Sequence, residues 1–155
     1  MKKLILLLFV STLIFQNLFS QKVVIRDNKF YNADGSLFTG TYKTYWDDDK
    51  KVKEEDPIQY GLLDGTSVLY FESGVKNEER SYSKGQKDGL WITWDENGNK
   101  TAEARFKEGK KDDFWYIWDE KGTLRYKMFY IKGQKKGNWT IWDETGKITS
   151  EHDFK

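Results

Sequence analysis

The feature that most constrains this chain is a pattern that returns every 24 residues along the sequence. Two tryptophan columns keep this step: Trp91, Trp115 and Trp139 form the first, and Trp94, Trp118 and Trp142 form the second. An aspartate and a glycine follow in step, and a further aromatic residue and a glycine close each unit. Such self-similarity is typical of arrays whose units bury their apolar faces only by stacking on their neighbours. The sequence therefore predicts one repeat domain rather than a globule built around a pocket.

Each unit has the pattern of a β-hairpin. Short aromatic and β-branched runs, such as residues 90–94 and 114–118, precede four-residue turns that begin with Asp and end with Gly, and a returning segment follows. Asp at the first turn position accepts backbone hydrogen bonds, and Gly at the last fits a type I turn with a left-handed residue and a bulge. Lys-rich turns join successive units. The predicted fold is all-β, a single-layer antiparallel meander of repeated β-hairpins with a 24-residue period.

The two tryptophan columns are predicted to lie on opposite faces of the sheet, because residues three apart in a strand point to opposite sides. Either row can be core, covered by neighbouring rings and by Lys or Arg stems, or it can be a binding surface. The sequence leaves both alternatives open for both rows. Candidate binding residues are therefore Trp94, Trp118 and Trp142 together with Trp91, Trp115 and Trp139.

The chain divides into three segments. Residues 1–20 have two lysines, an apolar run and a small residue at position 20, which predicts a cleaved signal peptide. Gln16 and Asn17 interrupt the apolar run and so favour cleavage over a membrane anchor. Residues 21–37 are predicted as an N-terminal strand, at 23–31, and a turn, and residues 38–155 as the repeat domain. Pro57 predicts an edge or bulged strand, because proline has no N–H group.

Charge and cysteine content limit the partners and the compartment. Loss of Lys2 and Lys3 with the signal peptide leaves 24 basic against 25 acidic residues, a formal net charge of about −1. The two signs are interspersed, which argues against nucleic acid and against anionic lipid as partners. The chain has no cysteine, so it carries neither a disulfide nor a cysteine-linked lipid anchor. We expect an exported protein, periplasmic or secreted.

Three kinds of chemistry can be weighed against the turn pattern. Acidic pairs such as Asp95-Glu96 recur in several units, whereas catalysis needs a unique site, so the aspartates are expected to cap turns. Asp95, Asn97 and Asn99 alternate as in a calcium loop, but the glycine comes too early and no distal Glu follows. His152 is the single histidine and lacks cysteines for a zinc site. We expect no enzyme, no cofactor and no metal.

Residues 89–112, GLWITWDENGNKTAEARFKEGKKD, combine a glycine, two aromatic residues three apart, Asp-x-x-Gly, and an aromatic residue before x-x-Gly. This segment resembles the MORN repeat, in the variant found in bacterial toxin–antitoxin-system antitoxin-like proteins. The resemblance covers residues 61–155 well and 38–60 loosely. It implies an elongated hairpin array that acts as a scaffold, adaptor or binding surface and has no characteristic catalytic residues. Two positions depart from the pattern: Asp113 replaces a glycine, and Ser67 stands in the first Trp column.

These observations predict an exported, non-enzymatic repeat scaffold that binds another macromolecule. We expect the partner to be a protein, in an adaptor or an antitoxin-like or immunity-like role, because Trp and Tyr concentrate binding energy at interfaces. The alternative is a cell-envelope glycan-binding module in which sugar rings stack on the Trp rows. An enzyme is the third and weakest alternative.

Overall fold

The computed structural model describes residues 22–47 and 51–155. Within these ranges the regular structure is almost entirely β-strand and turn, and there is no α-helix. The part of the chain that the structure describes therefore has no helix with the length and apolarity needed to cross a membrane. The predicted signal peptide lies outside the described residues.

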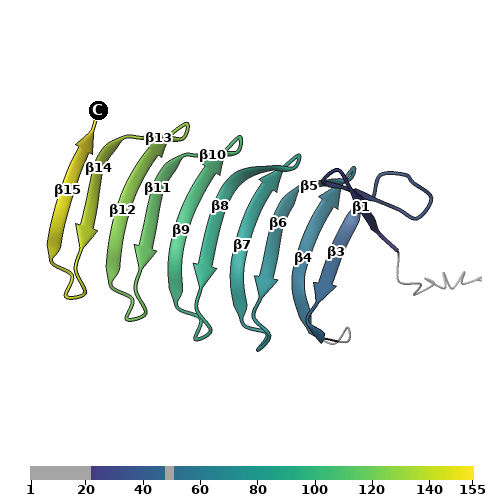
Figure 1. The fold of residues 1–155 in the computed structure, drawn as a ribbon, viewed down its shortest axis with the longest axis horizontal. Helices are drawn as coiled ribbons and strands as arrows, with labels where there is room; N and C mark the ends of the chain where they lie inside the picture. Colours follow the sequence, from purple (N-terminus) through teal and green to yellow (C-terminus); the bar gives the residue numbers. More distant parts are fainter. Residues whose placement is uncertain (1–21, 48–50) are drawn as a thin grey trace, which may run out of the picture.

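Ten strands form five consecutive hairpins in one sheet (Figure 1). The hairpins are β3 (Gly40–Tyr45) with β4 (Val52–Gln59), β6 (Gly65–Tyr70) with β7 (Lys76–Ser83), β8 (Gln86–Trp94) with β9 (Lys100–Lys107), β11 (Asp113–Trp118) with β12 (Leu124–Ile131), and β14 (Gly137–Trp142) with β15 (Ile148–Phe154). Three two-residue strands, β5 (Leu62–Leu63), β10 (Lys110–Lys111) and β13 (Gln134–Lys135), extend the turns between them. Spatial order follows chain order from β3 to β15, so the predicted antiparallel meander is confirmed.

The turn that closes each hairpin is built as the sequence predicts. Asp95 Oδ1 accepts hydrogen bonds from the backbone N–H groups of Asn97 and Asn99, at 2.9 and 2.8 Å. Asp119 and Asp143 accept the equivalent bonds one and two repeats later. A register shift precedes each of these turns, as the predicted bulge requires. The recurring aspartates are therefore turn caps.

The turns between hairpins tie each unit to the one before it. Their two central residues both have positive φ, as at Lys84-Gly85, Glu108-Gly109 and Lys132-Gly133, which is the type I′ geometry of tight hairpin turns. The Gly109 N–H donates to the Lys87 carbonyl at 2.8 Å, and the Gly133 N–H donates to the Lys111 carbonyl at 2.7 Å. Asp88 adds a side-chain bond by accepting from the Glu108 N–H at 3.1 Å.

Three of the junctions between adjacent hairpins have only two ladder pairs each, and tryptophan side chains add hydrogen bonds at β9–β11 and β12–β14. Between β9 and β11 the register has only two pairs, Tyr116 with Glu103 and Ile117 with Ala102. Beyond them the Trp115 Nε1 donates to the Arg105 carbonyl at 3.1 Å. In the next repeat, the Trp139 Nε1 donates to the Phe129 carbonyl at 3.0 Å. Trp115 and Trp139 therefore satisfy backbone carbonyl groups where the hydrogen bonds between neighbouring strands end.

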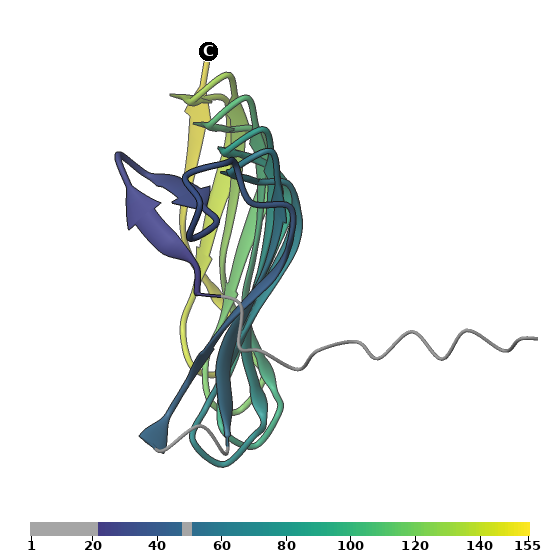
Figure 2. The same ribbon diagram turned by 90° about the vertical axis from the view of Figure 1, so that its right-hand side faces the viewer.

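The N-terminal segment is a hairpin, so the single strand predicted at residues 23–31 is wrong. β1 (Val24–Arg26) and β2 (Lys29–Tyr31) pair across Asp27 and Asn28, whose φ angles are 50° and 58°. Asp and Asn tolerate this left-handed geometry better than most residues, a turn signal that the β-branched run concealed. The hairpin folds over one face of the sheet, on the inner side of its bow (Figure 2). Phe30, Phe38 and Ile58 are buried together there.

Pro57 lies in an internal strand, so the predicted edge position is wrong. β4 has β3 on one side and β6 on the other. The β4–β6 ladder, however, is formed only at Glu54 and Glu55 and has already opened before it reaches Pro57. The Pro57 carbonyl instead accepts from the Asp64 N–H at 3.0 Å. An internal strand can hold the proline because its missing N–H faces this gap.

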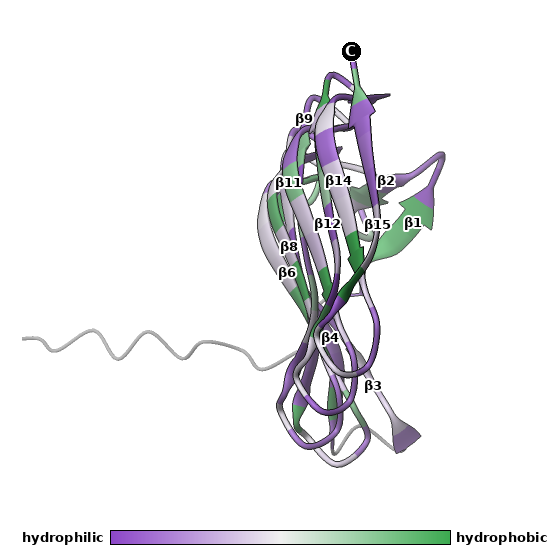
Figure 3. Cartoon of the chain, turned by 90° about the vertical axis from the view of Figure 1, so that its left-hand side faces the viewer, coloured by the Kyte–Doolittle hydropathy of each residue, from purple (hydrophilic) through white to green (hydrophobic). Residues whose placement is uncertain are grey.

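The two faces of the sheet differ in what covers them. We call the face that carries Trp91, Trp115 and Trp139 the ladder face; the register places Phe106, Ala104 and Tyr130 on it as well. The other we call the opposite face, and it carries Ile92, Glu103, Tyr116 and Lys127. Hydrophilic and hydrophobic stretches are mixed along the strands (Figure 3). The N-terminal hairpin covers only the first part of the ladder face.

Candidate functional site: the two tryptophan faces

The first Trp column is part of a continuous ladder of aromatic rings. Successive ring centroids lie between 4.9 and 6.1 Å apart, with the planes tilted by 54° to 62°. The ladder consists of Tyr82, Trp91, Phe106, Trp115, Tyr130, Trp139 and Phe154. Tilted, edge-to-face contacts of this kind are favourable beyond the area they bury. The ring contacts of this row therefore pack four consecutive hairpins against one another.

One lysine in each unit lies over two rungs of this ladder. The Nζ of Lys87 is 4.1 Å from the Trp91 centroid and 5.0 Å from that of Phe106. Lys111 lies over Trp115 and Tyr130 in the same way, and Lys135 over Trp139 and Phe154. A cation over a ring face is attracted by the ring quadrupole. The ladder face therefore presents one ammonium group per repeat. Because each repeat contributes two strands, these groups lie about 10 Å apart.

A hollow of about 400 Å³ opens on the ladder face between Trp91 and Trp115. Thr93, Ala102 and Ala104 line it, together with Lys87 and Lys111. One repeat later Tyr126 and Met128 occupy the positions of the two alanines. The hollow therefore exists because one unit carries small residues where its neighbour carries large ones.

Exposed apolar side chains continue from this hollow toward the C-terminus. Ile117 pairs across the strands with Tyr126, and Tyr126 pairs with Ile141. Ile117 is 37% exposed and Tyr126 is 39% exposed. Large apolar residues that remain open beside a hollow are typical of a docking surface.

Acidic residues gather at the other end of the ladder face, where Ser67 replaces a tryptophan. Arg80 forms ion pairs with Glu78, at 2.6 Å, and with Glu54, at 3.8 Å. Burial raises the pKa of the neighbouring Asp56, and the positive charge of Arg80 opposes that rise. Burial also raises the pKa of Glu54, and the charge of Asp56 adds to the effect. The ladder face thus changes from acidic, over β4 and β7, to apolar and basic, over β8 to β12.

The opposite face holds the second Trp column. Lys76 lies over Trp94 and forms an ion pair with Glu79, and Lys100 lies over Trp118 and forms an ion pair with Glu103. In β11 three aromatic rings stack along the strand, because Phe114, Tyr116 and Trp118 alternate on one side. Their interplanar angles are 25° and 29°, with centroids 5.9 and 5.7 Å apart. These interplanar angles are smaller than those of the ring contacts in the ladder.

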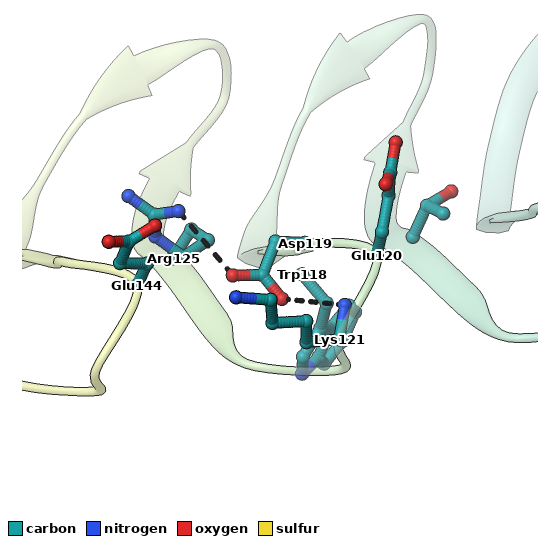
Figure 4. Close-up of a pocket in the computed structure, with 7 residues that line it drawn as sticks. Trp118, Asp119, Glu120, Lys121, Arg125 and Glu144 are labelled. Carbon is teal, nitrogen blue, oxygen red and sulfur yellow. Dashed lines mark hydrogen bonds and ion pairs between the residues drawn. The ribbon is translucent and has the colours of Figure 1, made fainter.

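Charged groups surround the turn end of Trp118 (Figure 4). The Arg125 guanidinium donates to the Asp119 carboxylate at 3.4 Å and to the Trp142 carbonyl at 2.9 Å. Glu120, Lys121 and Glu144 line the same shallow hollow of about 380 Å³. Asp119 is held by its role as a turn cap. Through these bonds Arg125 ties the end of this hairpin to the next one.

All six predicted tryptophans are half-buried, so neither row is wholly core or wholly exposed. The structure joins Trp91, Trp115 and Trp139 through the rings between them, whereas no ring contact joins Trp94 to Trp118 in the described residues. Sequence reasoning missed the lysines at positions 87, 111 and 135 that cover the ladder. Their own 24-residue step was a signal that could have found them. It also missed the hollow, which follows from comparing Ala102 and Ala104 with the same positions one repeat later.

His152 lies exposed in the edge strand β15, with its Nε2 3.2 Å from Ser150 Oγ. Over residues 22–47 and 51–155 no group of three or more His, Cys, Asp or Glu side chains is arranged to hold a metal ion. Asp95 and its neighbours are used by the turn. The candidate site on the ladder face is formed by apolar and cationic groups.

Comparison with known families matches the MORN repeat variant at residues 87–108 and 135–155. The first match covers all but the first residue of the hairpin β8–β9, and the second covers the hairpin β14–β15. The hairpin between them has the same turn cap, bulge and Trp positions. No curated protein matches the chain. These matches and the repeated hairpins support a MORN-repeat protein.

Proposed function

We propose that this array of MORN repeats is an exported, non-enzymatic scaffold whose ladder face binds another protein. The observation that carries the proposal is the apolar surface of β8 to β12, where Ile117 and Tyr126 are exposed beside the hollow between Trp91 and Trp115. Burial of such side chains is the main source of free energy in protein association. The role is that of an adaptor or an immunity-like binder, as the resemblance to antitoxin-like proteins suggests.

A protein fits the ladder face better than a sugar does. Sugar rings stack on open aromatic faces, but Lys87, Lys111 and Lys135 lie over the rings of this row, and the rings are tilted against one another. The hollow itself is lined mainly by apolar atoms, which give a polar sugar few hydrogen-bond partners. Apolar side chains of a partner protein have no such requirement.

The turn chemistry supports a non-enzymatic role. Asp95, Asp119 and Asp143 are the acids that recur most regularly, and each accepts hydrogen bonds from backbone N–H groups.

The proposal that the protein is exported rests on the sequence of residues 1–20. N-terminal sequencing of the protein from the culture fluid or periplasm tests it, and a mature chain that begins near residue 21 is the expected result.

The binding proposal is tested with two matched variants. Ile117 and Phe114 lie in the same strand, are both 37% exposed and point to opposite faces. We expect Ile117→Glu to abolish recovery of the partner by affinity capture, and Phe114→Glu to preserve it, with both variants folded by circular dichroism. Recovery that survives Ile117→Glu and is lost in Phe114→Glu would move the binding surface to the other side of the sheet.

A glycan-binding role for the opposite face is the second candidate. The near-parallel stack of Phe114, Tyr116 and Trp118 favours it, since three flat rings in line match the CH faces of successive sugars. Titration with envelope polysaccharides, followed by tryptophan fluorescence, tests this role. A change that Trp118→Ala removes and Trp115→Phe retains would support it. An unchanged emission spectrum at millimolar sugar would reject it.

A further inference from the structure

The hollow on the ladder face is specific to one repeat and is flanked by two cations. We infer that it receives one aromatic or branched aliphatic side chain of the partner, from a segment with acidic residues on both sides of that side chain. This inference rests on the proposed protein-binding function and names the chemistry that the ladder face recognises. It follows from the shape of the hollow, the charge around it and the spacing of the repeats.

The shape favours a single large side chain. A volume of about 400 Å³ is at the lower end of the range for ligand pockets, and Trp91 and Trp115 form its two walls. Ala104 lines the hollow between them and contributes only a methyl group. In the following repeat, Met128 stands at the same position opposite Trp115. The protein thus fills this position with its own side chain in one unit and leaves it open in the unit before.

The charges favour an acidic segment. Among the residues that the structure describes, neither Lys87 nor Lys111 takes part in an ion pair, and both ammonium groups are held over ring faces. Arg80, whose guanidinium lies 5.5 Å from the Trp91 centroid, is already paired with Glu78 and Glu54. Unpaired cations at the rim of an apolar hollow attract carboxylates and penalise basic residues.

The distance between Lys87 and Lys111 determines how far apart the two acidic residues of the partner segment lie. Lys87 and Lys111 are equivalent positions in neighbouring hairpins, about 10 Å apart on the spacing of two strands. The side chains on one face of an extended segment recur at every second position, so acids four positions apart span about 13 Å, which flexible lysine and carboxylate side chains can adjust to the distance between the two ammonium groups. The expected motif has two acidic residues four positions apart, with the apolar residue midway between them. Such a segment places its carboxylates over both lysines when its apolar side chain enters the hollow.

Selection from a displayed library of random peptides tests the inference. The purified protein is the bait, and a variant whose hollow is filled, Ala104→Met, is the counter-bait. The chain itself carries methionine at the equivalent position, so this variant is expected to fold. We expect the selected peptides to share the acidic and apolar motif and to bind Ala104→Met roughly tenfold more weakly or worse, the effect of blocking an apolar subsite.

A second variant separates charge from shape. Lys87→Gln combined with Lys111→Gln keeps the aliphatic stems over the rings and removes both ammonium charges. A synthetic peptide from the selection is expected to bind this variant several-fold more weakly at low salt, with the difference shrinking at high salt. Peptides without acidic residues, peptides that bind Ala104→Met as well as the unchanged protein, or no enrichment over an empty support would each overturn the inference.

Capture of the native partner by two variants separates failure of this inference from failure of the proposed function. If Ile117→Glu abolishes capture of the native partner while Ala104→Met does not, the ladder face binds protein but the hollow is not its anchor. If neither change affects capture, the ladder face is not the binding surface. Loss of capture in both variants, together with the motif in the selected peptides, is the result that the inference expects.

Discussion

The Nζ of Lys111 lies 4.1 Å from the centroid of Trp115 and 4.9 Å from that of Tyr130, so one ammonium group spans two rungs of the aromatic ladder. Lys87 and Lys135 repeat this relationship one unit before and one unit after. The lysine stems cover ring surface that a single-layer sheet would otherwise leave to water. Neighbouring rings and lysines therefore provide the cover that a second layer provides in other β-proteins.

Two tryptophans of the ladder differ in one hydrogen bond, and this difference predicts their effect on stability. The Trp115 Nε1 donates to the Arg105 carbonyl, whereas the buried Trp91 Nε1 has no partner among the described residues. Both Trp→Phe changes remove similar apolar area. We expect Trp115→Phe to lower the free energy of unfolding by about 1 kcal/mol more than Trp91→Phe does. Urea unfolding of the two variants measures this, and equal losses would contradict it.

The contact between Asp88 and the next turn predicts sensitivity to acid. A hydrogen bond from the Glu108 backbone N–H, aided by Lys107, lowers the pKa of Asp88. A lowered folded pKa stabilises the protein above the unfolded value, about pH 4, and this contribution is lost as the pH falls through the folded pKa. We expect Asp88→Asn to be less stable than the unchanged protein at pH 7 and closer to it at pH 2 to 3. Thermal unfolding across this range checks the convergence. A constant difference would show that charge plays no part.

Asp56 predicts the opposite dependence. Burial raises its pKa, so the folded state holds the proton more tightly than the unfolded state does. Its effect on stability is therefore favourable in acid and is lost as the pH rises from about 4 through the folded pKa. Relative to the unchanged protein, Asp56→Asn is expected to gain stability between pH 4 and pH 7. Denaturant midpoints at both pH values provide the test, and a relative loss over this interval would count against a raised pKa.

Gly89 predicts a backbone requirement at the start of a repeat. Its φ is 106°, and an added Cβ would lie 2.9 Å from the Ser81 Cβ. We expect Gly89→Ala to cost about 1 to 3 kcal/mol, because it combines backbone strain with this contact. Asp113 stands at the equivalent position with φ of 66°, within the left-handed region that Asp tolerates, so Asp113→Gly is the control and should change stability little. Chemical unfolding would refute the argument if the two substitutions had similar effects.

Much of the fold was predictable because the turn residues and the 24-residue step act locally. Asp95 and Gly98 specify their turn without help from distant residues, and the step fixes the hairpin register. Two local predictions failed, the first because a local turn signal was overlooked and the second because tertiary context decided it. Asp27 and Asn28 turn the chain where a β-branched run suggested one strand, and Pro57 occupies an internal strand where the ladder to its neighbour has opened.

The candidate site was predictable only in part. The six tryptophans and their two faces follow from strand alternation. Whether each row is covered depends on side chains from other units, such as Lys87 over Trp91. The hollow depends on two alanines that interrupt the repeat. Regularity in the sequence predicts the hairpin array, whereas the proposed binding surface arises where Ala102 and Ala104 depart from the repeat.

Site-specific photo-crosslinking in the native cell tests the central claim most directly. A photo-reactive amino acid is placed at Ile117, on the ladder face, or at Phe114, equally exposed on the opposite face of the same strand. The account predicts one protein cross-linked from position 117 and none from position 114. Cross-links to that protein from position 114 alone, or no cross-link to any protein from position 117, would contradict it.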